Sequence, residues 1–160
     1  MSKEYLATYL NDHLTCSVQE VEILDHLADE IPDLAVFSQT LKPDIEADRQ
    51  QLQTLMDRLN VSESRVRKVG GWVAERFAEV KLTMDDKSRG PLRRLERLEV
   101  LALGIEGKIA LWRALGAAAD IDSQLSGVDY EHLVLRAKEQ RRHVEVARLE
   151  AARLALPPKA

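Results

Sequence analysis

Residues 100–107 read VLALGIEG, and the first six of these side chains are all apolar. A helix that lacks a polar face is buried on most of its sides. The stretch lies inside a longer segment with helical periodicity, residues 92–118, whose other positions are more polar. The sequence therefore predicts a long helix with its middle enclosed by the rest of the protein.

Two further helical segments precede this one. Apolar residues recur at steps of three and four over residues 3–30 and 33–59, which indicates amphipathic helices. Pro32 separates them, because proline suits the first turn of a helix and disfavours helical backbone in the residue before it. Pro43 lies inside the second segment, where we expect a kink or a break into two pieces.

The remaining segments complete a pattern of five helices. A third helix is expected over residues 62–82, followed by a polar surface loop over 84–91. After a linker at 120–127, the last helix is expected over 130–154, with Asp129 as its N-cap. No strand is predicted. Long helices joined by short connections predict an all-α antiparallel bundle.

Composition limits the classes of protein to consider. The chain has 160 residues, one cysteine, 23 basic and 27 acidic side chains, and a net charge of −4. This charge argues against a general nucleic-acid binder, and no apolar stretch approaches the length of a membrane span. A lone cysteine excludes an internal disulfide and favours a reducing compartment. We expect one cytoplasmic domain over residues 1–160 that binds neither nucleic acid nor membrane.

Charge is divided unevenly along the chain. Residues 1–61 hold 4 basic and 12 acidic groups, a net charge of −8, whereas residues 62–160 hold 19 and 15, a net charge of +4. This asymmetry favours packing of the first two helices against the later ones. Solvated helix faces are an alternative explanation for part of it.

Glutamates lie on the first, second, fourth and last of the predicted helices. Glu20 lies on the first helix, and Glu106 follows the apolar run of the fourth. The second helix contains Glu-Ala-Asp-Arg at 46–49, and the last contains Glu-Gln-Arg-Arg at 139–142. This layout resembles the ferritin-like superfamily, in which two helices each supply a Glu and two supply a Glu-x-x-His, together holding two metal ions. The resemblance implies a ferritin-like four-helix bundle with an additional helix between its two hairpins.

The chain departs from that pattern at the ligands, since arginine replaces both histidines. Arginine stays protonated and cannot coordinate a metal, but its guanidinium can bind carboxylates through two hydrogen bonds. We therefore expect Arg49 and Arg142 to replace the metal in a buried or half-buried salt-bridge network without a catalytic role, metal or cofactor. The residues expected at this vestigial site are Glu20, Glu46, Arg49, Glu106, Glu139, Arg142 and His143.

The resemblance extends to tryptophans beside small residues, at Gly70-Gly71-Trp72 and near Trp112. This resembles a bacterial branch of the superfamily with an added helix, and it implies that both tryptophans pack where that helix meets the bundle. The role implied is protein interaction or assembly, with the chain as a homodimer or bound to another protein.

Three alternatives remain open. Both arginines can point outward, which would make the motif match accidental. A metal-binding ferritin-like protein of bacterial stress response, holding iron, manganese or zinc, would use Glu20, Glu106, Glu139 and an inward-facing His143, while His13, Cys16 and Glu20 form a second weak metal set. An adaptor would read an acidic partner through residues 89–97, which requires that face to be exposed.

Overall fold

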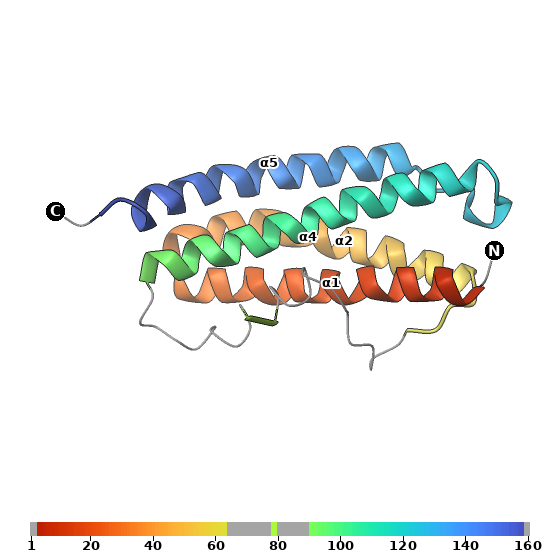
Figure 1. Ribbon diagram of the computed structural model, residues 1–160, viewed down its shortest axis with the longest axis horizontal. Helices are drawn as coiled ribbons and strands as arrows, with labels where there is room; N and C mark the ends of the chain where they lie inside the picture. The colour runs from red at the N-terminus through yellow and green to blue at the C-terminus, as the bar shows by residue number, and fades with distance from the viewer. Residues whose placement is uncertain (1–2, 64–77, 80–89, 159–160) are drawn as a thin grey trace.

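A computed structural model describes residues 3–63, 78–79 and 90–158. These residues form four long α-helices and two short 3-10 helices, with no strand among them (Figure 1). The predicted all-α class is therefore confirmed. The elements are α1 (Lys3–Glu30), η1 (Pro32–Leu34), α2 (Ala35–Arg58), α4 (Gly90–Ala119), η3 (Ser123–Leu125) and α5 (Tyr130–Ala155).

The first hairpin consists of α1 and α2, joined through η1. Pro32 opens η1, where its missing N–H has no helical partner to lose. Of the kink or break predicted at Pro43, the break is wrong, since α2 continues through this residue as one helix. α2 ends where predicted, because Asn60 adopts the left-handed backbone (φ 55°) typical of a helix C-terminus.

The second hairpin consists of α4 and α5. The predicted linker between them holds the short η3, whose N-cap Asp122 accepts a hydrogen bond from the Gln124 N–H at 2.9 Å. Asp129 caps α5 as predicted, accepting from the His132 N–H at 3.0 Å. Side-chain caps satisfy amide groups that have no partner within a helix.

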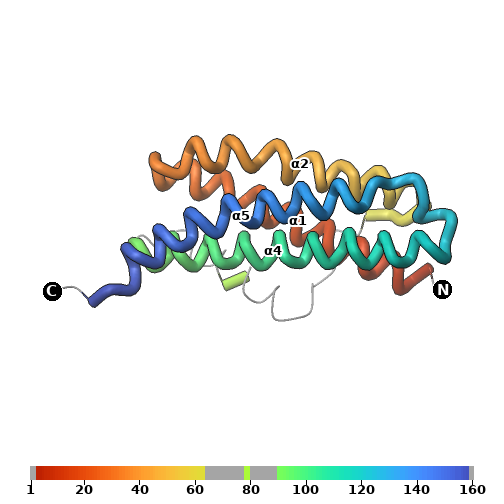
Figure 2. Tube along the Cα trace, turned by 90° about the horizontal axis from the view of Figure 1, so that it is seen from above, coloured from red at the N-terminus to blue at the C-terminus, as the bar shows by residue number. Residues whose placement is uncertain are grey.

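The two hairpins lie side by side with a particular order of directions. α2 and α4 run the same way along the bundle, so α4 begins at the end where α2 begins (Figures 1 and 2). α4 packs extensively against α5, α1 packs against α2, and α1 also contacts α4, whereas α2 and α5 touch little. The bundle is therefore closed along three seams and more open along the fourth.

Apolar side chains fill the interior in two adjoining clusters. Val100, Leu101 and Ile105 of α4 are completely buried, which confirms that the middle of this helix is enclosed. A second cluster surrounds Trp112, whose ring lies 6.4 Å from the ring of Tyr130 between centroids. No helix in the described part of the chain has the length and hydrophobicity needed to cross a membrane.

Part of the sequence-based description lies outside the described residues. This applies to almost all of the additional helix predicted over residues 62–82, with Trp72, and to most of the loop predicted over 84–91. At the end of that loop, α4 begins at Gly90, two residues before the predicted start.

Candidate functional site

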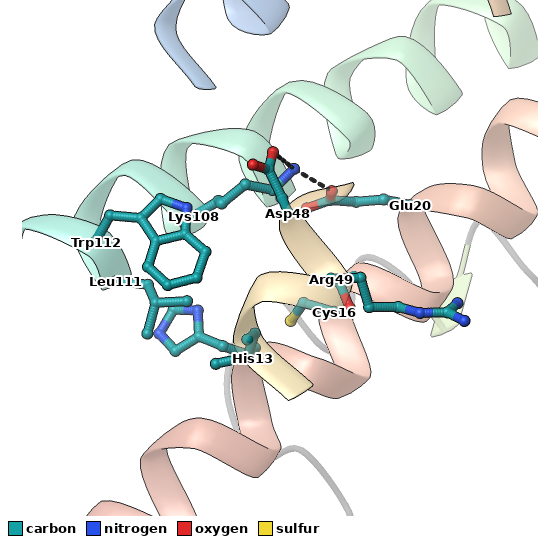
Figure 3. Close-up of a pocket in the computed structure, with 11 residues that line it drawn as sticks. His13, Cys16, Glu20, Asp48, Arg49, Lys108, Leu111 and Trp112 are labelled. Atoms are coloured by element: carbon teal, nitrogen blue, oxygen red, sulfur yellow. Dashed lines mark ion pairs between the residues drawn. The ribbon is translucent and has the colours of Figure 1, made fainter. Parts of the chain in front are cut away.

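One buried polar side chain from each long helix meets in the middle of the bundle. They are Glu20 of α1, Asp48 of α2, Lys108 of α4 and Gln140 of α5, each no more than 5% exposed (Figure 3 labels the first three). Burial of charged groups is costly unless they are paired and hydrogen-bonded. We call these four residues the central cluster.

Lys108 holds the central cluster together. Its Nζ lies 3.0 Å from Glu20 Oε2 and 3.3 Å from Asp48 Oδ2. It also donates a hydrogen bond of 3.1 Å to Gln140 Oε1. The ammonium thus contacts side chains of three different helices, through two ion pairs and one hydrogen bond.

Asp48 has partners on both of its oxygens. Gln140 Nε2 donates to Oδ2 at 2.7 Å, and the Arg136 Nε and Nη2 atoms donate to Oδ1 at 2.8 and 2.5 Å. Two carboxylates, Glu20 and Asp48, therefore face two cations, Lys108 and Arg136. The charges of these four side chains are balanced without an added ion.

The helices position these side chains through ordinary amphipathic spacing. Asp48 follows Ile45 by three residues and precedes Leu52 by four, so it lies on the buried stripe of α2. Glu20 occupies the corresponding stripe of α1, three residues after Ser17 and four before Leu24. A polar residue at an apolar position of the repeat is the sequence signal that identifies both.

A small cavity of about 10 Å³ adjoins the central cluster. A cavity of this size can hold at most about one water molecule. Its lining also includes His13, Cys16, Arg49 and Trp112, and the buried indole N–H of Trp112 has no hydrogen-bond partner among the described residues. The cavity has no room for an organic substrate.

The pKa values of three ionisable groups that line this cavity, Glu20, Cys16 and His13, are shifted toward the neutral form. Burial raises the pKa of Glu20, an effect that the neighbouring Lys108 opposes. Burial, followed by the charges of Glu20 and Asp12, raises the pKa of the Cys16 thiol to about 11. Burial also lowers the pKa of His13. A thiol with such a high pKa is a poor nucleophile at neutral pH, so Cys16 is a packing residue.

The described residues contain no group of three or more His, Cys, Asp and Glu side chains arranged to hold a metal ion. The central cluster contains two such side chains, Glu20 and Asp48, and the Lys108 ammonium lies between their carboxylates. His13 and Cys16 line the same cavity as Glu20, but they do not complete a metal site with it.

Most of the residues predicted for the vestigial site lie elsewhere. Glu20 is buried in the central cluster, as predicted. Arg49 is partly buried beside the cavity, but its guanidinium points away from Glu20 and Lys108 (Figure 3). The predicted burial is wrong for four residues that are exposed: Glu46, Glu106, Glu139 and Arg142.

Three of these four residues form ion pairs at the surface instead: Glu106, Glu139 and Arg142. Glu106 pairs with Arg141 across α4 and α5, with 3.2 Å between Oε1 and Nε. Glu139 pairs with Arg142 at 2.6 Å within α5, and the Nε2 atom of His143 lies 3.4 Å from Glu139. His143 therefore does not face inward beside Glu106, as the metal-binding alternative requires.

Helix geometry explains these errors. Successive residues on a helix are rotated by about 100°, so a shift of one or two positions moves a side chain to another face. Asp48 is two residues after Glu46, and Gln140 is one residue after Glu139. The predicted positions along the helices are therefore close to those of the central cluster, but the predicted helix faces are wrong.

A second polar contact joins the hairpins near one end of the bundle. Arg97, which is 1% exposed, donates a hydrogen bond of 2.5 Å to Glu30, and Arg93 donates one of 2.8 Å to the same carboxylate. Burial opposes a downward shift, but the hydrogen bond from Arg97 and the charges of both arginines lower the pKa of Glu30 overall. The adaptor alternative requires an exposed face here, and these two arginines are buried against an acidic neighbour.

Comparison with known proteins adds no further constraint. No protein-family model, curated protein or solved structure matches this sequence.

Proposed function

We propose that this protein is a non-catalytic, ferritin-like bundle that serves in protein assembly, with a lysine ammonium in place of a bound metal. The observation that supports this proposal is the position of Lys108 between Glu20 and Asp48, at the level where all four helices contribute a polar residue. In metal-binding bundles of this kind, inward-facing carboxylates from facing helices require divalent cations. Here a covalently attached cation supplies the positive charge.

The order of helix directions is consistent with this proposal. α2 and α4 run in the same direction, so the bundle needs one long crossover connection between its hairpins (Figure 1). Bundles of the ferritin type have one such crossover, whereas simple up-and-down bundles have none.

The chemistry of lysine explains why this arrangement favours a structural role. Unlike a metal ion, an ammonium that is paired with two carboxylates has no open coordination position for a substrate and no electron to exchange. The Lys108 ammonium already forms ion pairs with Glu20 and Asp48 and donates a hydrogen bond to Gln140. The central cluster therefore orients the four helices and leaves the outer surface of the bundle to carry the function.

Elemental analysis of the untagged full chain tests the proposal. The protein is purified without chelators, exposed to iron, manganese and zinc, and desalted. We expect far less than one ion per chain. One or two tightly held ions per chain would contradict the proposal and support the metal-binding alternative, with loss of the ions in Glu20→Gln or His13→Ala identifying the ligands.

A charge reversal at Lys108 provides a gain-of-binding test. Lys108→Glu places a third carboxylate beside Glu20 and Asp48, so we expect a lower melting temperature that Mn²⁺ or Zn²⁺ restores. Lys108→Met is the matched control, because it removes the same ammonium without adding a ligand. If metal raises the melting temperatures of both variants equally, the central cluster does not occupy a former metal position.

A further inference from the structure

α5 carries an exposed face that no described element covers. In Figure 1 the helix α5 lies along the upper edge of the bundle, and in Figure 2 this helix runs across the side nearest the viewer. Half of the exposed large apolar side chains among the described residues lie on α5 or at its C-cap. We call the following set of exposed residues the α5 face: Leu135, Glu139, Arg142, Val146, Leu149, Glu150 and Arg153.

The α5 face continues into a groove between α5 and α2, along the seam where these two helices touch little. The groove has a volume of about 410 Å³. Phe37 and Leu41 form its wall on α2, and Val146 and Ala147 form its wall on α5. Val146 is 54% exposed, so the middle of the α5 face is an apolar side chain open to solvent.

The charges on the α5 face are arranged symmetrically with opposite signs about Val146. Glu139 lies seven residues before Val146 and Arg153 seven residues after it. Arg142 lies four residues before Val146 and Glu150 four residues after it. In an antiparallel helix pair centred on one residue, positions equally far before and after that residue are level with each other. This surface is therefore complementary to a copy of itself.

We propose that the α5 face binds a second copy of this chain, with the two α5 helices antiparallel and the two-fold axis at Val146. Glu139 then faces Arg153 of the partner subunit, and Arg142 faces Glu150 of the partner subunit. The two Val146 side chains meet at the centre. This proposal names the partner for the assembly role proposed above and rests on that role.

The energetic cost of forming this contact is small. Glu139 and Arg142 already form an ion pair within α5, but both side chains are more than half exposed. Such surface pairs contribute little to stability, so either side chain can turn to a new partner.

A stable dimer buries about 800 Å² on each subunit, which exceeds what one helix face supplies. The α2 wall of the groove, with Phe37, provides additional apolar surface.

Sedimentation velocity of the full chain over a wide range of concentrations tests the proposal. We expect wild type to form a concentration-dependent dimer. Val146→Glu places two like charges at the two-fold axis and is expected to raise the dimer dissociation constant by roughly a hundredfold. Ile121→Glu is the matched control, because Ile121 is 93% exposed in the turn after α4 and lies outside the α5 face. It should leave the dimer intact.

Exchange of the symmetric charges provides a more specific test. Glu139→Arg and Arg153→Glu each place like charges opposite each other twice per dimer, so each variant alone is expected to bind itself about tenfold more weakly. An equimolar mixture of these two variants should associate with near wild-type affinity, since every contact in the mixed dimer pairs opposite charges. Circular dichroism should report the same helix content in all variants.

Each outcome supports or overturns the proposal. A monomeric wild type at all concentrations overturns it, as does a dimer that Val146→Glu leaves unchanged. Single variants that weaken the dimer without recovery in the mixture would overturn the antiparallel register. None of these results depends on metal content, so failure of this inference is distinguishable from failure of the metal-free function, which elemental analysis tests.

Discussion

Lys108 is the residue on which the interior of this bundle depends. It is one of few charged side chains in the described residues that are almost fully buried, and its ammonium contacts carboxylates from two other helices. A buried ion pair contributes little net stability compared with apolar packing, but removing one partner leaves an uncompensated charge in the interior. The central cluster therefore makes the four helices mutually dependent in register.

The raised pKa of Glu20 makes the free energy of unfolding depend on pH. Burial raises its pKa above the ordinary value of 4.5, so the folded protein holds this proton more tightly than the unfolded chain does. The stability that Glu20 contributes is complete below pH 4.5 and is lost as the pH rises through the folded-state pKa. We expect Glu20→Gln to lack this decline in the free energy of unfolding.

Urea unfolding of wild type and of Glu20→Gln, at a series of pH values from below 4.5 upward, provides the measurement. The difference between wild type and variant isolates Glu20, because His13 titrates in both. A difference that stays constant with pH would show that the pKa of Glu20 is unshifted.

At the scale of the element, α2 tolerates a proline that its own backbone disfavours. Pro43 lies in the helix interior on the solvent side, where it removes one hydrogen bond to the preceding turn. The buried residues on either side of it, Leu41 and Ile45, continue the apolar stripe without interruption. Packing of this stripe against α1 therefore outweighs the local preference for a break.

Pro43→Ala measures the size of that local cost. The substitution restores the missing backbone N–H without touching the core, so we expect the free energy of unfolding to increase by about 2 kcal/mol. Urea denaturation checks this value. Ala47→Gly, at another exposed position of α2, should change stability in the opposite direction by about 1 kcal/mol. A destabilised Pro43→Ala would mean that the proline shapes the helix in a way that packing requires.

At the scale of the whole molecule, ion pairs across the two hairpins reflect the charge division of the sequence. The acidic first hairpin supplies Glu30, Glu20 and Asp48, and the second supplies their cationic partners. The contacts fall at two levels, represented on α4 by Arg97 and Lys108. These residues are 11 positions apart, or about 16 Å along the helix.

This separation predicts that the two levels stabilise the molecule independently. Glu30→Gln and Asp48→Asn are each expected to lower the free energy of unfolding by about 2 kcal/mol, because each leaves a buried cation short of its partner. The double variant should lose the sum of the two within about 0.5 kcal/mol, as distant sites do. Urea unfolding of all four proteins completes the cycle. A coupling energy above about 1 kcal/mol would contradict the independence of the two levels.

The sequence by itself determined the helices and most of their ends. Periodicity located α1, α2, α4 and α5, and the cap at Asp129 followed from local chemistry. The resemblance to the ferritin-like pattern pointed to Glu20, whose position in the buried stripe of α1 is a local feature. These properties depend on hydrogen bonds and side chains within a few residues of one another, which the sequence order specifies directly.

Only the tertiary structure decided which polar residues meet. Asp48, Lys108 and Gln140 join Glu20 because four helices pack with a particular rotation and register, and neither quantity is encoded within a single helix. A rotation of one residue, about 100°, separates buried Gln140 from exposed Glu139. The identity of the cation at the centre, lysine and not arginine, therefore follows from how the hairpins pack, since long-range contacts set which face of each helix is buried.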